Sequence, residues 1–386
     1  MKVCILCGAP PNINDGVGDF SWLLAQELGK GNTVSLIVPG GDGEEQYADY
    51  GSVAVYRVNK AWGIQASIEV CRIVRRVNPQ IILVHFVPQL YGWNGAKPLF
   101  ALLLLALKRR EYRIVTVAHE FSAPFGPSPK LIVVAFVHRL LLWLIKRASR
   151  RIVVTTRFAL SLFKRRFPTR QGDFLQIPIS STIPVVPVDK TRKEDLRREL
   201  RIAPEEFVIA TFGSVVGSAA TLLEELLSWF IHEVKRSRIL ILGKAGEEVR
   251  RKLAQNRVIL DRTVTTGPLS SEAVSEHLSI SDLLVVFYPD GCSTRRTSLM
   301  VGLAHGVPTV SNIGVLTDAS LKASGAMYLI NCHMTEEQAM ALRQLCRDAR
   351  LRADLGKQGK AFFEEHLSWK EIGRQYVLLL QEALTA

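Results

Sequence analysis

The order of apolar segments along the chain constrains the fold more than any other sequence feature. Short runs rich in Val, Ile and Leu alternate with segments of helix length, first over residues 1–180 and again over residues 207–330. Strands separated by helix-length segments imply right-handed crossovers and a parallel sheet covered on both faces. The strands are continuously apolar, as expected of strands buried on both sides. The sequence therefore predicts an α/β protein with two Rossmann-like, doubly wound parallel-sheet domains.

The expected elements follow this alternation. In the first half, we expect strands at Lys2–Gly8, Thr33–Pro39, Val53–Val58, Ile81–Phe86, Arg113–His119, Arg151–Thr155 and Phe174–Ile179. The helices of that half are expected at Val17–Gly29, Trp62–Val77, Lys97–Lys108, Lys130–Ser149 and Phe158–Phe167. In the second half, we expect strands at Phe207–Phe212, Arg238–Leu242, Val258–Asp261, Leu283–Phe287, Val307–Ser311 and Ala326–Ile330. Helices are expected between them, and residues 335–386 are expected to be helical nearly throughout.

Length and a proline-rich segment divide the chain. Its 386 residues favour two domains, at roughly 100–200 residues per domain. Ile177–Val188 holds three prolines and has no helical period, so we interpret it as an extended linker. We expect domains at 1–180 and 181–366, facing each other across a cleft. Ligands would then bind at the carboxyl ends of the strands.

Composition excludes several classes of protein. With 48% hydrophobic and 22% charged residues, the chain can build full cores and is not disordered. Cys4 and Cys7 form a C-x-x-C inside the first strand, but no second pair completes a metal site, so we favour buried reduced thiols over zinc or redox chemistry. No signal peptide is visible, and no apolar run approaches the ~20 residues of a membrane span. We therefore expect a cytoplasmic protein, soluble or bound peripherally to a membrane.

The excess of positive charge lies in one segment. The net charge is +13, and residues 97–170 contain 16 Lys and Arg but only two acidic residues. These bases alternate with large apolar side chains, which indicates an anionic membrane surface as partner of residues 97–151, at the inner face. The alternative is that the helices here are core crossovers with basic ends. Nucleic acid is a poorer explanation, because no nucleic-acid-binding motif is present.

Two candidate sites lie in the first half. Gly16, Val17, Gly18 and Asp19 lead into a helix, where backbone amides favour anions and polar oxygens. This loop is not a dinucleotide fingerprint, because Ser21 occupies the place of the third glycine. His119 ends a buried strand and would face the ligand crevice, where a neutral His can bond a sugar hydroxyl. The alternatives are a plain capped turn and a structural His.

The most specific candidate site is Tyr288–Gly306. A very apolar strand leads into it, and a buried helix is expected to begin near Thr297 and to stop at Gly306. Hydroxyls, free amides and two guanidinium groups at such a helix start suit a diphosphate. The candidate residues are Ser293, Thr294, Arg295, Arg296, Thr297 and Ser298. Simple helix capping beside surface arginines is the alternative.

Other loops are expected at the same edge. Gly213 and Ser214 follow one strand and Lys244 follows the next, although ordinary strand–helix turns explain both equally well. No D-x-D occurs, so the usual signature of a metal bound with a sugar nucleotide is missing. We therefore expect Arg, Lys and helix dipoles, without a metal or cofactor, to meet the diphosphate charge.

These segments together resemble the GT-B glycosyltransferases of group 1, or family 4, over nearly the whole chain. The glycine loop at Gly16 resembles the family's acceptor-side loop, and Val115–Glu120 resembles its strand ending in a sugar-contacting His. Phe212–Ser214 resembles the first C-domain loop, and Thr266–Ser270, with Gly267 and Leu269, resembles the turn beside the nucleotide base. Residues 367–386 resemble the helix that crosses back onto the N-terminal domain.

The resemblance implies an enzyme that moves a sugar from a nucleotide-diphosphate sugar to a glycan or lipid-linked acceptor, with retention, as in polysaccharide biosynthesis. His119, Arg295 and Arg296 would be its catalytic residues. Two departures stand out. The family's Arg and Lys are missing from Val215–Leu222, and Ser293 and Val301 occupy the places of its Glu-x7-Glu. Our hypothesis is that the two arginines replace the missing cations. A catalytically degenerate scaffold and a sugar-nucleotide epimerase are the rivals.

Overall fold

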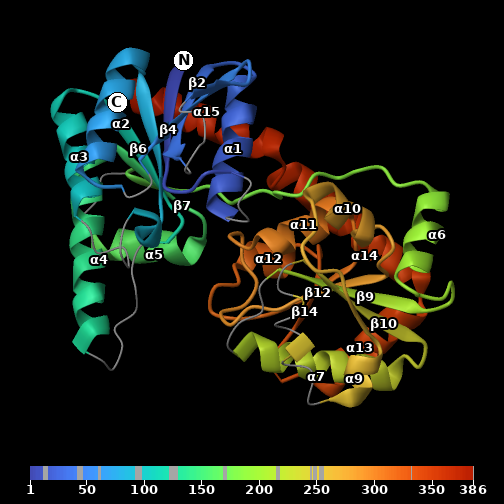
Figure 1. Cartoon of the computed structure of the whole chain (residues 1–386). Helices are drawn as coiled ribbons and strands as arrows, with labels where there is room; N and C mark the ends of the chain where they lie inside the picture. Colours follow the sequence, from blue (N-terminus) through green and yellow to red (C-terminus); the bar gives the residue numbers. More distant parts are fainter. Residues whose placement is uncertain are drawn as a thin grey trace. The chain divides into compact units, whose positions relative to one another are not determined.

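The computed structural model of the chain describes all residues except 12–15, 41–46, 60–61, 92–97, 121–128, 168–171, 214–217, 244–245, 247–249, 252–255, 332 and 386. The chain forms two compact units, Met1–Pro178 with Trp369–Ala386, and Ile179–Ser368. Each unit is a parallel or nearly parallel sheet covered by helices (Figure 1). The predicted fold class, with two Rossmann-like parallel-sheet domains, is confirmed.

The sheet of the first unit has eight strands in the described part of the chain, in the order β3-β4-β2-β1-β5-β6-β7-β8. They are β1 (Lys2–Cys7), β2 (Thr33–Pro39), β3 (Tyr47–Asp49), β4 (Val53–Val58), β5 (Ile81–Phe86), β6 (Arg113–Ala118), β7 (Arg151–Val154) and β8 (Phe174–Gln176). The edge strand β3 pairs antiparallel with β4 and was not predicted. Strand β3 has only three residues, and none of them is buried. It therefore contains no apolar run from which a strand could be predicted.

Helices cover both faces of this sheet. The buried side chains of α2, α3 and α4 form one cluster with β1, β4 and β5. The other face carries α1, which packs against the C-terminal helix α15. The bounds are α1 (Gly16–Gly29), α2 (Ile64–Val77), the 3-10 turn η1 (Pro88–Tyr91), α3 (Leu99–Arg109), α4 (Pro129–Ala148), α5 (Arg157–Arg166) and α15 (Trp369–Thr385).

Helix α15 belongs to the first unit although it follows the second in sequence. Ile372, Tyr376 and Leu380 lie one turn apart on its buried face and are fully inaccessible. At Gly373 the two helices come so close that a Cβ would lie 2.5 Å from Cγ of Glu27 in α1. The glycine therefore permits the close contact between α1 and α15.

The sheet of the second unit has six described strands, in the order β11-β10-β9-β12-β13-β14. Their bounds are β9 (Phe207–Phe212), β10 (Ser237–Leu242), β11 (Thr263–Thr265), β12 (Leu283–Val286), β13 (Thr309–Asn312) and β14 (Tyr328–Ile330). All pairs within the sheet are parallel. The helices of this unit are α6 (Lys190–Glu199), α7 (Ser218–Glu233), α9 (Arg257–Asp261), α10 (Ser271–Leu278), α11 (Thr297–His305), α12 (Ala319–Ala323), α13 (Glu336–Arg347) and α14 (Ala349–His366). In Figure 1, α10, α11 and α14 lie on one side of the sheet and α7, α9 and α13 on the other.

One predicted strand of this unit is wrong. Val258–Asp261 lies in the short helix α9, and the strand follows at β11. The Asn256 side chain caps the helix by accepting from the Ile259 amide, at 3.3 Å. Ile259 is fully buried while Val258 is half exposed, so only part of the apolar run VIL packs into the core. The cap, not the apolar run, decides the local structure.

Candidate functional site

The topology places one switch point in each sheet. In the first unit the strand order reverses between β1 and β5, and in the second it reverses between β9 and β12. Ligands of open α/β sheets bind beyond the carboxyl ends of the strands at such points. The predicted glycine loop follows β1 and the predicted anion loop follows β12, so each lies at the switch point of its own unit.

The predicted glycine loop forms the first turn of α1. Helix α1 begins at Gly16, so Gly16, Val17, Gly18 and Asp19 are helical rather than part of a free loop. A Cβ on Gly18 would lie 2.3 Å from the carbonyl oxygen of Pro10. The second glycine is therefore required by packing, and Asp19 lies in the first turn, where a carboxylate stabilises a helix.

His119 directly follows β6 and is half-buried. Its backbone N–H donates to Phe86 O at 3.1 Å, which ties it to the end of β5. Its Nε2 lies 2.9 Å from Nδ1 of His85, which is the second-last residue of β5. The His85 side chain is fully buried. Burial lowers the pKa of His119 from 6.5 to about 4 and holds the pKa of His85 well below its usual range. Both rings are therefore neutral at pH 7.

An aromatic side chain braces this pair. The Phe20 ring from α1 meets both imidazoles edge-on, with ring centroids 5.7 Å from His85 and 5.4 Å from His119. Trp369, at the start of α15, packs on the other side of Phe20 with centroids 5.2 Å apart. The predicted His is thus held by groups from β5, α1 and α15, which are far apart in sequence.

The second candidate site is the loop between β12 and α11. Asn312 at the end of β13 fixes its start, since its side chain accepts from the Tyr288 amide and donates to the Tyr288 carbonyl. The backbone of Gly291 passes so close to Gly314 that a Cβ there would lie 2.2 Å from its nitrogen, and Gly291 also has φ +85°. The loop is therefore fixed by β13 and by close backbone contact.

The two predicted arginines share one carboxylate. Arg295 Nη2 lies 3.0 Å and Arg296 Nη2 3.1 Å from the two oxygens of Asp290. Arg296 also lies over the Tyr288 ring, with its Cζ 4.7 Å from the centroid. The side chains are 29% and 22% exposed, so neither guanidinium extends into bulk solvent. We expected the two arginines to need an anionic partner, and Asp290 of the same loop is one. The three side chains together carry one net positive charge.

Helix α11 begins at Thr297 and ends before Gly306 with φ +65°, as predicted. Residues Leu299–Ala304 are buried, so packing fixes the position of the helix. The side chain of the N-cap residue Arg296 makes no hydrogen bond to the amides of the first turn. Ser298 Oγ lies 2.8 Å from the Tyr288 hydroxyl. Gly213, at the end of β9 with φ +95°, approaches the same serine, since a Cβ would lie 3.2 Å from it. The structure thus brings Gly213 and the start of α11 together at the switch point.

Two predicted hydroxyl groups face inward. Ser293 is fully buried, and its Oγ has no hydrogen-bond partner among the described residues. Thr294 is also buried; its hydroxyl lies 3.5 Å from Asp318, and its carbonyl accepts from the Ile179 amide. Their side chains therefore line the interior of the loop rather than its accessible surface.

Of the remaining predicted donor residues, Gly267 and Leu269 follow β11. Gly267, with φ +68°, bridges to Gly243, and Thr266 Oγ1 accepts from the Gly243 amide. Leu269 is half-buried between this bridge and α10. Ser214 and Lys244 lie outside the described residues. Structure therefore joins the turn at Gly267 to the loop that carries Lys244.

The predicted burial of Cys4 and Cys7 in the first strand is observed. Cys4 and Cys7 are buried in β1 and form no disulfide, and burial raises the pKa of Cys4 to about 12. Among the described residues, no group of three His, Cys, Asp or Glu side chains is placed to hold a metal ion.

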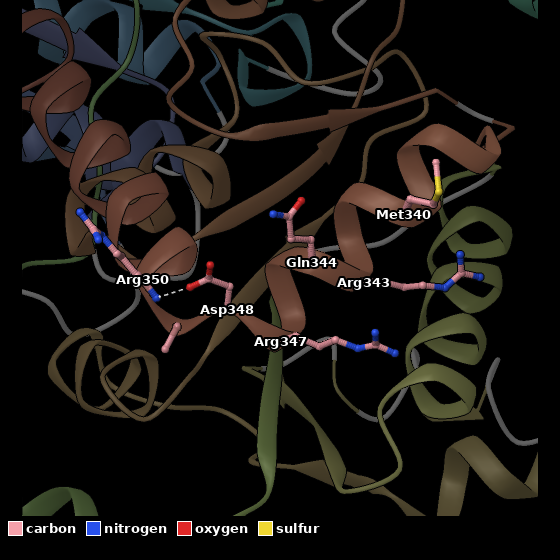
Figure 2. A pocket seen from close by; sticks show the side chains of 7 residues that line it. Met340, Arg343, Gln344, Arg347, Asp348 and Arg350 are labelled. Carbon is pink, nitrogen blue, oxygen red and sulfur yellow. Dashed lines mark hydrogen bonds between the residues drawn. The ribbon is translucent and has the colours of Figure 1, made fainter.

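An open hollow of about 690 Å³ lies at the junction of α13 and α14 (Figure 2). Arg343 there pairs with Glu233 and Glu336, and Asp348 caps α14. In Figure 2, the Arg350 side chain extends to the opposite side from Arg343 and Arg347. The arginines do not converge, so this hollow is not a candidate anion site.

Three residues of the sites were missed from the sequence. His85 is the one polar residue of the strand IILVHF, and that break in an apolar run was a usable signal. Asp290 lies five residues before Arg295, and an acid so close to two bases indicates an internal ion pair. Asn312 gave no signal, because a polar residue at a strand end is common.

No protein-family model and no curated protein matches the chain. Solved structures do. The chain is similar to sucrose-phosphate synthase from Thermosynechococcus elongatus, with 15% identity over 100% of this chain and 99% of that one, and a TM-score of 0.73. It is similar to HepE from Anabaena in complex with UDP and glucose, with 15% identity over 99% of this chain and 100% of that one, and a TM-score of 0.67. It is also similar to WaaG, a glycosyltransferase involved in lipopolysaccharide biosynthesis, with 13% identity over 97% of this chain and 98% of that one, and a TM-score of 0.63. These neighbours are GT-B glycosyltransferases, so the expected GT-B fold is confirmed.

Proposed function

We propose that the chain is a glycosyltransferase that moves a sugar from a nucleoside-diphosphate sugar to a glycan or lipid-linked acceptor. The observation that carries the proposal is the start of α11, where Arg295 and Arg296 lie beside the first turn of the helix at the switch point of the second unit, and the side chain of the N-cap residue Arg296 makes no capping hydrogen bond. Neighbours of the same fold were solved with UDP and glucose and with ADP and acarbose, which supports a nucleotide as the ligand.

Asp290 sets the electrostatics of this site. Its carboxylate neutralises one of the two guanidinium charges and keeps both side chains beside the helix start. A diphosphate carries more charge than one carboxylate, and it also gains the amides and dipole of α11. We therefore expect a diphosphate to compete with Asp290 for both arginines.

The same groups would promote transfer. Negative charge grows on the diphosphate as the sugar leaves, and Arg295, Arg296 and the first amides of α11 are donors that can stabilise it. Removal of one such donor typically lowers the rate by ~10²–10³. We extend the proposal to transfer without a metal ion. Retention at the anomeric carbon is proposed on the family resemblance alone. We also propose that His119 and the Gly16–Asp19 turn contact the sugar or the acceptor.

A thermal-shift screen of nucleoside diphosphates tests the proposal. We expect at least one of UDP, ADP, GDP and their glucose conjugates to raise Tm in the parent chain, and the shift to vanish in the variant Arg295→Ala, Arg296→Ala. The control is Arg347→Ala, Arg350→Ala, which removes the same charge from the exposed hollow of the same unit. A shift that persists in the first variant, or the absence of any shift in the parent, contradicts the assignment of this site.

The rival is a scaffold that binds nucleotide sugar without transfer. It is favoured by Ser293 and Val301 at the places of the two family glutamates, both fully buried here. Release of free nucleoside diphosphate from its sugar conjugate separates the two, because slow hydrolysis occurs in an active transferase without acceptor. Binding with no release above that of the double variant favours the scaffold.

We propose further that the first unit docks on an anionic membrane, at its cytoplasmic face. Helices α3 and α4 pack together and have buried faces, as the crossover alternative predicted. Helix α4 also exposes large apolar side chains, and α2 and α3 expose further ones. They are Ile64, Ile68, Leu102, Leu131, Ile132, Val133, Phe136, Leu140 and Trp143. Among the described residues, no helix is long and apolar enough to span a bilayer.

Basic groups accompany the apolar surface. A groove of about 430 Å³ between α2 and α3 is lined by apolar side chains together with Arg72, Arg75 and Arg110. Arg147 lies over the Trp143 ring, with Cζ 5.1 Å from the centroid. Each basic residue near anionic lipid contributes about 1 kcal/mol, and the apolar side chains add burial in the interface.

Vesicle sedimentation tests this docking. The parent chain should bind vesicles that contain phosphatidylserine more than vesicles of neutral phosphatidylcholine alone, and should bind them less at high salt. Phe136→Asp, Leu140→Asp should lower the bound fraction at least about tenfold, the equivalent of about 1.4 kcal/mol. The control Val315→Asp, Met340→Asp changes equally exposed residues of the second unit. Equal binding of both variants contradicts the proposed surface.

A further inference from the structure

The contact between His85 and His119 can be a hydrogen bond in either of two directions, and the direction depends on the tautomers of the two rings. Nδ1 of His85 and Nε2 of His119 are 2.9 Å apart, and the ring planes are nearly parallel, with an interplanar angle of 21°. A neutral imidazole carries one N–H and one bare nitrogen, so exactly one of the two facing nitrogens holds a proton. The proton's position fixes the outward nitrogen of each ring.

Two arrangements satisfy the contact. If His85 Nδ1 donates, then His85 Nε2 is bare and the proton of His119 lies on Nδ1. If His119 Nε2 donates, then His85 Nε2 carries a proton and His119 Nδ1 is bare. The two arrangements present opposite chemistry to a ligand, since Nδ1 of His119 is a donor in the first and an acceptor in the second.

The buried side of His85 selects between them. His85 Nε2 is inaccessible to solvent and has no hydrogen-bond partner among the described residues. Among backbone groups, buried N–H groups without an acceptor are rarer than under-satisfied buried acceptors, and we apply the same order to the ring nitrogens of His85. The first arrangement leaves a bare nitrogen at this position, and the second would leave an N–H.

We propose that His85 is a positioning residue that donates from Nδ1 to His119 and so fixes His119 as the Nδ1–H tautomer. His119 then offers an N–H to an acceptor oxygen of the ligand and does not act as a base. Phe20, held by Trp369, keeps both rings in place. That the ligand oxygen belongs to a sugar rests on the proposed glycosyl transfer; the tautomer does not.

Nitrogen NMR of the full chain tests the tautomer without ligand or turnover. With histidine labelled at both ring nitrogens, two-bond proton–nitrogen correlations at pH 7 distinguish a protonated Nδ1 from a bare one. The signals of each ring are assigned by their loss in the variants His85→Asn and His119→Gln. We expect protonated Nδ1 on both His85 and His119 in the parent chain. A bare Nδ1 on His119 overturns the proposal.

Variants of His85 test its positioning role. Asn keeps an N–H donor near the place of Nδ1, so His85→Asn should retain the Nδ1–H tautomer of His119. His85→Leu should return His119 to a mixture of tautomers, with the cooperative unfolding transition of both variants measured alongside. An unchanged tautomer in a folded His85→Leu chain contradicts the role. These signals are measured in the chain without ligand. Failure of the tautomer proposal can therefore be distinguished from failure of the nucleotide screen.

Discussion

At the scale of single residues, both candidate sites depend on a neighbour that changes what the predicted residue can do. His119 is neutral and oriented because burial and His85 surround it. Arg295 and Arg296 are held at the helix start by Asp290, which also lowers their combined charge. His85 comes from the adjacent strand β5 and Asp290 from the same loop as the two arginines, and each converts a general side chain into a specific donor.

The low pKa of His119 makes the stability of the chain depend on pH. The pKa falls from 6.5 to about 4 on folding, so between these values the unfolded chain binds more protons than the folded one. The stabilisation from the neutral ring is complete above pH 6.5 and is lost as the pH falls toward 4. Between pH 7.5 and 5, His119 should lower the free energy of unfolding by about 2 kcal/mol, at roughly 1.4 kcal/mol per unit.

Urea unfolding at these two pH values measures the effect. The variant His119→Asn does not titrate at this position, so its free energy of unfolding should fall by about 2 kcal/mol less than that of the parent. His85 adds a change of the same sign in both chains. Identical pH dependence in parent and variant would show that His119 titrates normally in the folded state.

At the scale of elements, α15 is the clearest case of a helix whose role depends on one face. Its buried residues pack on α1, and the Arg150 side chain donates to the Ala383 carbonyl near its end. The helix therefore connects the C-terminal end of the chain to the support of the His85–His119 pair through Trp369 and Phe20.

Two leucines in α15 separate packing from helix propensity. Leu380 is fully buried, whereas Leu378 is 47% exposed. We expect Leu380→Ala to lower the free energy of unfolding by about 2–5 kcal/mol, because it leaves a cavity. Leu378→Ala should change it by less than about 0.5 kcal/mol. Denaturant unfolding of both variants measures the difference, and equal effects would place α15 outside the core of the first unit.

At the scale of the whole molecule, the chain builds the same architecture twice and then returns to the first copy. Each unit has its own core and its own switch point, and residues 369–386 join the first unit. The first unit is therefore complete only when the last helix of the chain is present. Its stability depends on a segment that follows the second unit in sequence.

Removal of residues 369–386 tests this dependence. Amide hydrogen exchange followed by mass spectrometry should show faster exchange in β1, α1 and β6, on the order of 100-fold, the equivalent of about 3 kcal/mol. Exchange in β9, β10 and β12 should stay within about threefold of the parent. Equal acceleration in both units would indicate one cooperative core rather than two.

The sequence by itself determined the fold class, most element positions and the start of α11, because apolar runs and helix stops are local signals. It did not determine the edge strand β3, the helix at Arg257–Asp261 or the partners His85 and Asp290. The edge strand and the His85–His119 contact depend on which groups tertiary folding brings together, and burial shifts the pKa values and selects the tautomer, whereas the Asn256 cap and Asp290 are local signals that the prediction missed. The local sequence pattern thus predicted where the two candidate sites lie along the chain. Contacts in the folded chain determined the protonation of His119 and the partners of the site residues.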